Sequence, residues 1–513
     1  MRVDTLFYNG NFFISPFDKR KINWLAVYEG WICDLGSGTP PRHLLVKQKI
    51  NLENRRVVPG WIDAHMHLML LGQQKFEIDV SQCHSTYELQ HVLKKALSRK
   101  KETVREMWLE AYGLNPERWK DSHPVTAQIL DSVSSNVAIL VRRNDEHALW
   151  VNSFLLNQTR LQQSHPIGYL VDKNMDMIFR IRPPQSPQKI EEALLYALQA
   201  CVREGITSVH DMSMQRLPLE VLADLMRAKK YDLRVYCALF GEEALETFSV
   251  PQTNLFHYHL TIRAQKLFID GALGSRGAWL SRPYDDMPQW AGRCLWQEKE
   301  LFKYVHRAFQ KRFQLIFHTL GDQASLWLLQ TLALKYKPEE LRDKRIRLEH
   351  VEVLNRDALS LMKQLGVIVS MQPWHALSDS SWLESRLGRE RLYQVSRLKE
   401  LVSQGIPVCG GSDAPIEPHQ PLWGIYAAIM RKPLKHHAPF LLDQRLSIRE
   451  ALYMYTLGGA YAEFSENVKG SLERGKLADF VVLSDDIFNM HPKEFLNVKV
   501  AMTVIGGKIV YAL

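Results

Sequence analysis

The chain has 513 residues, a formal net charge of +9 and a hydrophobic fraction of 46%. A chain of this length can form two or three structural units, and its composition is that of a soluble globular protein. Because no apolar run is long enough to cross a bilayer and no basic-then-apolar signal opens the chain, we expect a cytoplasmic protein without a membrane partner. The six cysteines are scattered without a Cys-x-x-Cys pair, which argues against a disulfide framework or a cysteine-built zinc site.

The positive charge raises the question of nucleic-acid binding. The basic residues form short clusters, such as Lys94-Lys95 and residues 342–347, and these are interleaved with acidic or apolar positions. None of the clusters repeats along one element together with stacking aromatic residues. We therefore expect a solvated basic surface and no nucleic-acid partner. The expected partner is a small-molecule substrate, and a homodimer is the assembly that we keep open.

The two ends of the chain are both rich in strand patterns. The predicted strands near the N-terminus are Thr5–Tyr8, Phe12–Ile14, Trp24–Tyr28, Trp31–Leu35 and Leu44–Ile50, with a turn at Asn9-Gly10. This is too little chain for a self-sufficient sheet, so it should need a partner. The predicted strands near the other end are Ala478–Leu483, Val500–Ile505 and Lys508–Tyr511. We interpret residues 1–56 and 466–513 as the two halves of one small β-sandwich.

Between these halves, residues 57–465 alternate short apolar strands with amphipathic helices. After a first strand that leads into His67, the predicted strands are 138–141, 205–209, 233–240, 265–269, 314–317, 346–348, 367–371 and 407–410. The alternation predicts a parallel sheet, and about eight repeats in this length favour an α/β fold of the (β/α)8 TIM-barrel type. The polar, proline-interrupted stretch within about residues 70–189 exceeds what one repeat needs, so we expect an insertion there.

The stretch Val57–Leu68 carries the first chemical signal. After a Pro-Gly break, a short strand presents Asp63, His65 and His67, and alternation along a strand points these three side chains the same way. Two imidazoles two residues apart can bind one divalent metal. The alternative is a half-exposed strand that carries histidines without binding metal.

Further ligand-type residues stand where later predicted strands end, which is where such barrels place their active sites. These residues are His318, His350 and Asp413, together with Lys266, which opens the run Lys266–Gly271. A lone histidine at a strand end is more often satisfied by hydrogen bonds than bound to metal. Four histidines and an aspartate at successive strand ends are hard to explain in that way, and they predict a metal site.

At this point the chain resembles a known family. The segment Pro59–His67 looks like the opening motif of the amidohydrolase superfamily, and later segments resemble its YtcJ-like, amidohydrolase-3 branch. These segments are Arg142–Ser153, Gly205–Asp211, Lys266–Leu280, His318–Ala324, Arg347–His350, Gln372–His375, Gly411–Pro415 and Gly475–Asp479. They follow the order of the family. One departure is Glu146, which precedes His147 where the branch usually has glycine.

The resemblance implies a metal-dependent hydrolase of amide or related C–N bonds, with one or two divalent ions, zinc foremost. By position, His65 and His67 match the ligands of a first metal, and His318 and His350 match those of a second. Asp413 matches the catalytic aspartate that also touches metal. Lys266 matches a lysine that CO2 carboxylates so that it bridges two ions, and His147 matches a substrate-facing residue.

The chemistry of these side chains agrees with such roles. A divalent metal lowers the pKa of a coordinated water from 15.7 to roughly 7. Asp413 would orient that water, accept its proton and pass the proton to the leaving nitrogen, while His318 or His375 would help to polarise the carbonyl. For Lys266 the alternative role is an ion pair with Asp270 or another carboxylate.

Substrate identity stays open at this stage. Arg276, with Trp279 and Trp374, could line a pocket for an acyl or aromatic group, and Arg276 could equally be an ordinary ion-pair residue. The leading interpretation is an amide or N-acyl hydrolase. The alternatives are a deaminase or cyclic-amide hydrolase on the same scaffold, and a non-catalytic binding protein. The complete ligand set opposes the last of these.

Overall fold

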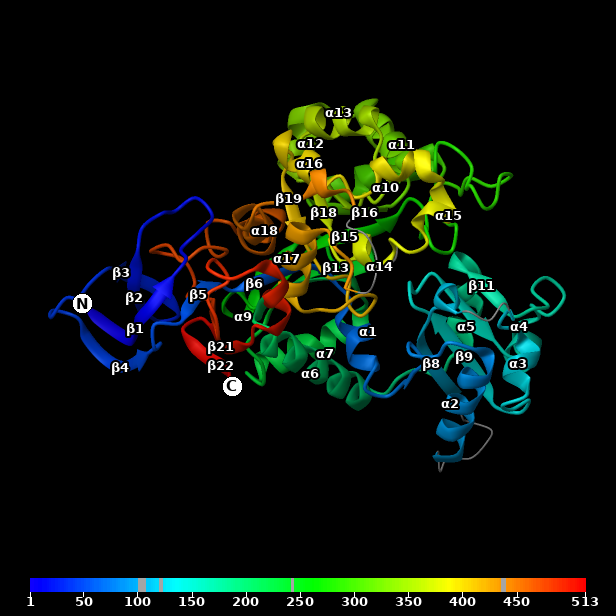
Figure 1. Cartoon of the computed structure of the whole chain (residues 1–513), viewed down its shortest axis with the longest axis horizontal. Coiled ribbons are helices and arrows are strands. Elements are labelled where there is room, and N and C mark those ends of the chain that lie inside the picture. The colour runs from blue at the N-terminus through cyan, green and yellow to red at the C-terminus, as the bar shows by residue number, and fades with distance from the viewer. Residues whose placement is uncertain (100–107, 120–122, 241–243, 435–439) are drawn as a thin grey trace.

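The computed structural model describes residues 1–99, 108–119, 123–240, 244–434 and 440–513. The undescribed segments 100–107 and 120–122 fall inside the stretch where the sequence predicts an insertion. Among the described helices, none is both long and apolar enough to span a membrane. Figure 1 shows three regions side by side, with the barrel between a sheet built from the two chain ends and a separate unit that carries β8 to β11.

The centre of the molecule is a parallel barrel. Its strands, in order around the sheet, are β6 (Trp61–Met66), β12 (Ile206–Met214), β13 (Arg234–Phe240), β15 (Leu260–Phe268), β16 (Gln314–Thr319), β17 (Arg347–His350), β18 (Ile368–Met371) and β19 (Val408–Gly410). The barrel closes where the backbone N–H of Asp413 donates to the carbonyl of His65 at 2.7 Å and that of His67 donates to Ala414 at 2.8 Å. The predicted (β/α)8 fold is therefore confirmed.

Helices surround these strands, and most of them are amphipathic and pack one apolar face on the sheet. The longer ones are α6 (Pro187–Arg203), α7 (Arg216–Arg227), α10 (Glu298–Gln310), α11 (Asp322–Ala333), α13 (Arg356–Leu365) and α17 (Pro421–Met430). Local chemistry defines their ends. Helix α6 begins where the Ser186 side chain accepts from the backbone N–H of Lys189, and α13 begins where the Asn355 side chain accepts from that of Ala358. At its other end α13 is capped by Gly366, which has φ +66°.

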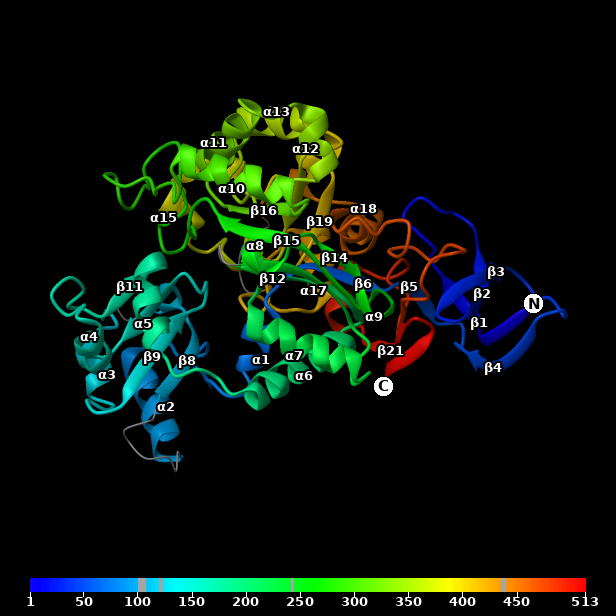
Figure 2. The ribbon, with the colours of Figure 1, turned by 180° about the vertical axis from the view of Figure 1, so that it is seen from behind.

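The two chain ends form one mixed sheet. It contains β1 (Arg2–Phe12), β2 (Ile22–Tyr28), β3 (Trp31–Gly36), β4 (Leu45–Asn51), β5 (Arg56–Pro59), β20 (Phe480–Leu483), β21 (Val500–Ile505) and β22 (Lys508–Ala512). The halves join where β5 pairs antiparallel with β20, and the Phe7 and Phe480 rings meet edge to face with centroids 4.8 Å apart. The small β-sandwich predicted from the two termini is confirmed, and Figure 2 shows its strands from behind.

One local prediction in this sheet is wrong. Asn9-Gly10 does not turn the chain, because β1 continues through both residues to Phe12. Asn9 has φ +55°, and the pairing with β2 shifts register between Tyr8 and Phe12. An Asn-Gly pair supplies the left-handed backbone that a β-bulge requires as readily as the one that a hairpin requires.

Between β6 and β12 the chain leaves the barrel and forms a separate sheet. Its strands are β7 (Ile78–Asp79), β8 (Trp108–Leu114), β9 (Ala138–Arg143), β10 (Ala148–Val151) and β11 (Tyr169–Val171). Its own apolar core includes Leu89, Leu109 and Ile139. The predicted strand at 138–141 is therefore present, but it belongs to this sheet rather than to the alternation of the barrel. We call the part of the chain from Ile78 to Ile181 the insertion sheet unit.

Candidate metal centre

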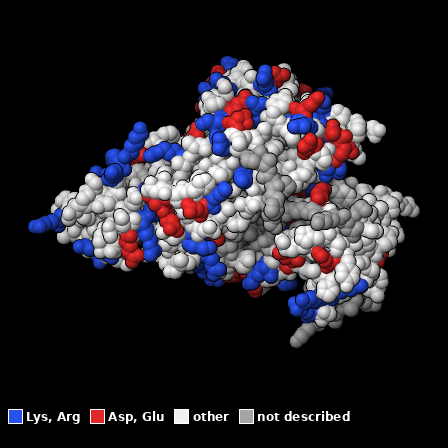
Figure 3. Space-filling model, in the orientation of Figure 1, with Lys and Arg blue, Asp and Glu red and all other residues white. Residues whose placement is uncertain are grey.

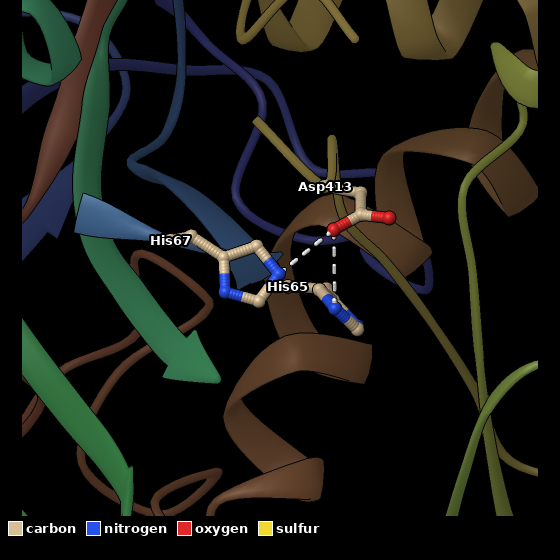
Figure 4. A group of neighbouring side chains, drawn as sticks. All are labelled: His65, His67 and Asp413. Carbon is tan, nitrogen blue, oxygen red and sulfur yellow. Dashed lines mark hydrogen bonds and ion pairs between the residues drawn. The ribbon is translucent and has the colours of Figure 1, made fainter. Parts of the chain in front are cut away.

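Two histidines at the end of β6 aim the same ring atom at one carboxylate. Nε2 of His65 and Nε2 of His67 lie 3.3 and 3.1 Å from Oδ1 of Asp413 (Figure 4). The opposite ring atoms are held by other residues. His65 donates from Nδ1 to Glu349 at 2.5 Å, and Nδ1 of His67 lies 2.8 Å from the Ser213 hydroxyl. Outer partners of this kind orient the ligands of metal sites.

The side chain of Asp63 holds the backbone that carries these donor residues. Its Oδ1 accepts from the backbone N–H of His65 at 3.1 Å and from that of Ser412 at 3.0 Å, so it joins the segments that carry His65 and Asp413. His350 and Asp413 have φ of +72° and +61°, a left-handed conformation that is uncommon for residues other than glycine. Such conformations concentrate at functional sites because the surrounding structure must hold them.

A second group of donors faces the other oxygen of Asp413. Nδ1 of His350 and Nε2 of His375 lie 3.9 and 3.7 Å from Oδ2. The three residues form one of two described groups with metal-ligand spacing, and the other is His65, His67 and Asp413. His318, which the resemblance places here, is adjacent, with its ring centroid 4.6 Å from that of His350. The structure thus brings His375 into the donor group and sets His318 beside it.

The electrostatics of Asp413 suit an acceptor of protons and of metal. Burial alone would raise the pKa of its carboxyl, but His65 and His67 outweigh burial and hold this pKa well below its usual range. Burial and the neighbouring His350 likewise hold the pKa of His318 well below its usual range, and burial does the same for His350. The two imidazoles are therefore neutral, which is the form that binds metal.

Lys266 lies buried in the wall of the same cavity, on β15. Burial lowers the pKa of its ammonium to about 8, although the carboxylates of Glu349 and Asp413 oppose this shift. Within the described residues, no ion pair joins Lys266 to Asp270. Asp270 instead accepts three backbone N–H groups, from Trp279 at 2.9 Å and from residues 320 and 321 at 3.0 and 2.8 Å.

The donor atoms fit a divalent metal. Nε2 of His318, Nδ1 of His350 and Nε2 of His375 are buried and have no hydrogen-bond partner among the described residues. A buried polar atom without a partner costs roughly 1–3 kcal/mol, and ligation would remove this cost. Neutral imidazoles with one carboxylate are the donors that zinc and similar ions prefer.

The donors form the floor of a cavity of about 620 Å³. Barrel residues line one side, and residues of the insertion sheet unit, including His147 and Asp172, line the other. His147 reaches the centre, with its ring centroid 5.0 Å from that of His318. Arg276 is absent from the lining residues, because it pairs with Asp286 through hydrogen bonds of 3.1 and 2.8 Å. The structure therefore places Arg276 in an ion pair and outside the cavity.

Sequence reasoning assigned no role to several residues that support the centre. Glu349 lies inside the quoted segment Arg347–His350, and it contacts His65 on one oxygen and Nε of Arg347 on the other, both at 2.5 Å. The signal available for Glu349 was a charged side chain on a strand of the barrel, which is fully buried. Ser213 and Asp172 offered no comparable signal, because their partners are distant in the chain.

A barrel whose strand ends converge on histidines and one aspartate with metal-ligand spacing has the site of a metal-dependent hydrolase. The model of a family described as the amidohydrolase family, Amidohydro_3, matches residues 48–511. The chain belongs to this amidohydrolase family, and the resemblance seen in its motifs is confirmed.

Relatives span nearly the whole chain. YtcJ of Bacillus subtilis (strain 168), whose name describes it as an amidohydrolase, is 30% identical over 491 residues, which are 90% of this chain and 90% of its own. Protein LONG AFTER FAR-RED 3 of Arabidopsis thaliana is 28% identical over 99% of this chain and 92% of its own length. An N-substituted formamide deformylase of Arthrobacter pascens is 25% identical over 50% of this chain and 46% of its own.

Solved structures agree with this assignment. An uncharacterized metal-dependent hydrolase from Pyrococcus horikoshii OT3 superimposes with a TM-score of 0.78 at 25% identity, covering 95% of this chain and 99% of the other. One from Pyrococcus furiosus gives 0.74 at 25% identity, covering 94% and 99%. Together with the donor groups, these likenesses identify metal-dependent hydrolysis as the general activity.

Proposed function

We propose that the protein hydrolyses a C–N bond of the amide or N-acyl type, other than a peptide bond, in a small-molecule substrate. The observation that carries the proposal is the position of Asp413, whose two oxygens face two histidine groups on the floor of one cavity. The likeness to an N-substituted formamide deformylase supports the bond type, although it covers only 50% of this chain.

Each residue of the centre has a distinct task in this proposal. His65 and His67 would hold one divalent ion, and His350 with His375 or His318 would hold a second, with zinc the first choice. Such an ion supplies a Lewis acid and lowers the pKa of a coordinated water to roughly 7. Asp413 orients the attacking water, accepts its proton and delivers that proton to the leaving nitrogen.

Lys266 has the environment that its proposed carboxylation requires. With a pKa of about 8, roughly a tenth of Lys266 is neutral amine at pH 7, which is far more than for an ordinary lysine, and this is the form that attacks CO2. The product is a carbamate, a two-oxygen anion that can bridge two ions. The carbamate would replace the lysine ammonium, whose positive charge would repel the two metal ions.

The cavity favours a substrate with an apolar group on nitrogen or carbon. Its volume of about 620 Å³ suits a small molecule. Phe240, Phe268 and Trp296 line it on the barrel side, and Met175 and Phe179 line it on the side of the insertion sheet unit. An aromatic or aliphatic amide would bury its substituent against these side chains while its carbonyl faces the histidines.

Nothing in the proposal involves nucleic acid or a membrane. On the face shown in Figure 3, Lys and Arg side chains are interspersed with Asp and Glu and do not form one continuous basic area. The expectations of a cytoplasmic location, of no nucleic-acid partner and of a homodimer as the assembly to test stay predictions.

The test is turnover by the metal-loaded protein on a panel of N-formyl and N-acetyl amines, N-acyl amino acids and cyclic amides. We expect release of a free amine and a carboxylic acid from members with an apolar substituent. Asp413→Asn provides the matched inactive control. Ring opening of a cyclic amide would assign the chain to the cyclic-amide hydrolase alternative. Release of ammonia from an amino-substituted heterocycle tested beside the panel would assign it to the deaminase alternative. Metal binding without turnover of any panel member would contradict the proposal.

A further inference from the structure

The insertion sheet unit reaches the metal centre through His147, in the connection between β9 and β10. Its ring centroid lies 5.0 Å from that of His318 and 5.9 Å from that of Phe268. Nδ1 of His147 is hydrogen-bonded to Oδ1 of Asp172 at 2.9 Å. Because Nδ1 is occupied, Nε2 is the ring nitrogen left for a group inside the cavity.

Asp172 holds His147 through its backbone as well as its side chain. Its N–H donates to the carbonyl of His147 at 3.0 Å, directly beyond the pairing of Ala148 with Val171. Asp172 has φ +49°, a left-handed conformation that only a few per cent of non-glycine residues adopt. The two residues therefore form one rigid unit at the end of the β10–β11 pair.

The barrel has a fitted recess for the carboxylate of Asp172. A Cβ on Gly271 would lie 2.9 Å from Oδ2 of Asp172, and a Cβ on Gly277 would lie 3.2 Å from the same atom. The loop that carries both glycines follows β15 and is anchored by Asp270, which accepts the backbone N–H of Trp279 at 2.9 Å. Any residue larger than glycine at position 271 would displace Asp172 or the loop.

We infer that Asp172 is a positioning residue that docks against Gly271 and Gly277 and holds His147 over the metal centre, where Nε2 of His147 contacts the substrate. The inference rests on the proposed function and deepens it, because it assigns part of substrate recognition to the insertion sheet unit. A carboxylate on one imidazole nitrogen sets the ring orientation and tautomer, and it leaves the other nitrogen directed at the ligand.

A merely structural role for the pair makes different predictions. If the bond between His147 and Asp172 only ties β10 to β11, its loss should lower stability and leave ligand binding unchanged. Asp131 offers a matched control in the same unit. Its carboxylate accepts from the Ser153 backbone at 2.9 Å and from the Ser153 hydroxyl at 2.6 Å, and it does not line the cavity.

The experiment uses the full-length zinc-loaded protein and acetohydroxamate, a small amide-like chelator whose binding does not depend on the natural substrate. Calorimetry gives its Kd, and elemental analysis gives the zinc content. We expect Asp172→Asn, His147→Ala and Gly271→Ala each to weaken acetohydroxamate binding by about tenfold or more at unchanged zinc content. Asp131→Asn should bind acetohydroxamate like the wild type. On a panel amide that is turned over, Asp172→Asn should raise KM more than it lowers kcat.

The outcomes separate the two proposals. Unchanged acetohydroxamate binding in both Asp172→Asn and Gly271→Ala would overturn the inference, and so would a failure of the zinc-loaded wild type to bind it. A wild type that binds zinc and acetohydroxamate but turns over no panel amide would contradict the proposed function. In that case the variants would still decide whether Asp172 positions His147.

Discussion

Replacement of Glu349 by glutamine should weaken metal binding although Glu349 is not a ligand. Its Oε2 accepts from Nδ1 of His65 at 2.5 Å and from Nη2 of Arg347 at 3.2 Å. Its Oε1 lies 2.5 Å from Nε of Arg347 in an ion pair, and the side chain is fully buried. Burial alone would raise the pKa of Glu349, but Arg347 and His65 outweigh burial and keep this carboxyl ionised. Both of its neighbours are donors, and both therefore require an acceptor.

A glutamine side chain has one acceptor oxygen and one donor nitrogen, so it cannot present an acceptor to both Nδ1 of His65 and Nε of Arg347. If it satisfies Arg347, its NH2 group faces Nδ1 of His65 and favours the tautomer that carries its proton on Nε2, the atom directed at Asp413. Loss of such an outer partner costs roughly 10- to 100-fold in metal affinity. That factor corresponds to about 1.4–2.7 kcal/mol.

The assay is a zinc titration against a competing chelator, with thermal unfolding measured with and without zinc. Glu110→Gln is the matched control, because Glu110, in the insertion sheet unit, forms an ion pair with Arg182 at 2.6 Å and contacts no histidine of the centre among the described residues. We expect Glu349→Gln to raise the Kd for zinc and to lose part of the thermal stabilisation that zinc gives the wild type. A zinc Kd equal to that of Glu110→Gln would refute the assigned role of Glu349.

Three further predictions concern catalysis, the bridge and the barrel–sandwich junction. Asp413→Asn should lower kcat by roughly 10²- to 10⁴-fold, measured on a panel amide with the far-UV spectrum as the check on folding; near wild-type kcat would move the general base to another residue. Lys266→Ala should lose most of the bound metal, and short carboxylic acids at high concentration should restore some activity; full metal content and activity in the variant would exclude a bridging lysine. Asp479 accepts from buried Arg234 at 2.6 and 2.8 Å. Burial alone would raise the pKa of Asp479, but Arg234 outweighs burial and lowers this pKa. The carboxylate therefore stabilises the fold at pH values above about 4, the pKa of an aspartate in the unfolded chain. The contribution should disappear as the pH falls through the lower folded pKa. Asp479→Asn should cost about 3–5 kcal/mol at pH 7 in denaturant unfolding and less in more acidic buffer; an equal cost at both pH values would contradict the assignment.

The order of strand and helix patterns was sufficient to predict the barrel and the sheet from the two chain ends. Alternation along β6 directs His65 and His67 to one side, and a parallel barrel brings strand ends to one face whatever lies in the intervening loops. The residues expected at those ends, among them His350 and Asp413, therefore meet in the structure. These relations depend only on local periodicity and on the direction of the strands.

The contacts of the individual site residues, in contrast, could not be predicted, because they join parts of the barrel whose separation is not encoded in the spacing of residues along the chain. His375 lies on a short helix after β18, and only the packing of that helix brings its Nε2 to within 3.7 Å of Asp413. Arg276, whose own φ is +61°, pairs with Asp286 and does not line the cavity. Asp172 and Gly271 are 99 positions apart in the chain (271 − 172), yet one needs the space that the other leaves.

Local sequence thus determined which side chains stand at the mouth of the barrel. Their pairing required the closed structure, because hydrogen bonds and steric fit act over about 3–4 Å while the residues concerned come from strands, loops and an insertion far apart in the chain. The same short range explains why Asn9-Gly10 could be read either as a turn or as a bulge. A two-residue hairpin turn of the Asn-Gly type needs positive φ at both residues, whereas here only Asn9 has it and the pairing with β2 continues beyond both.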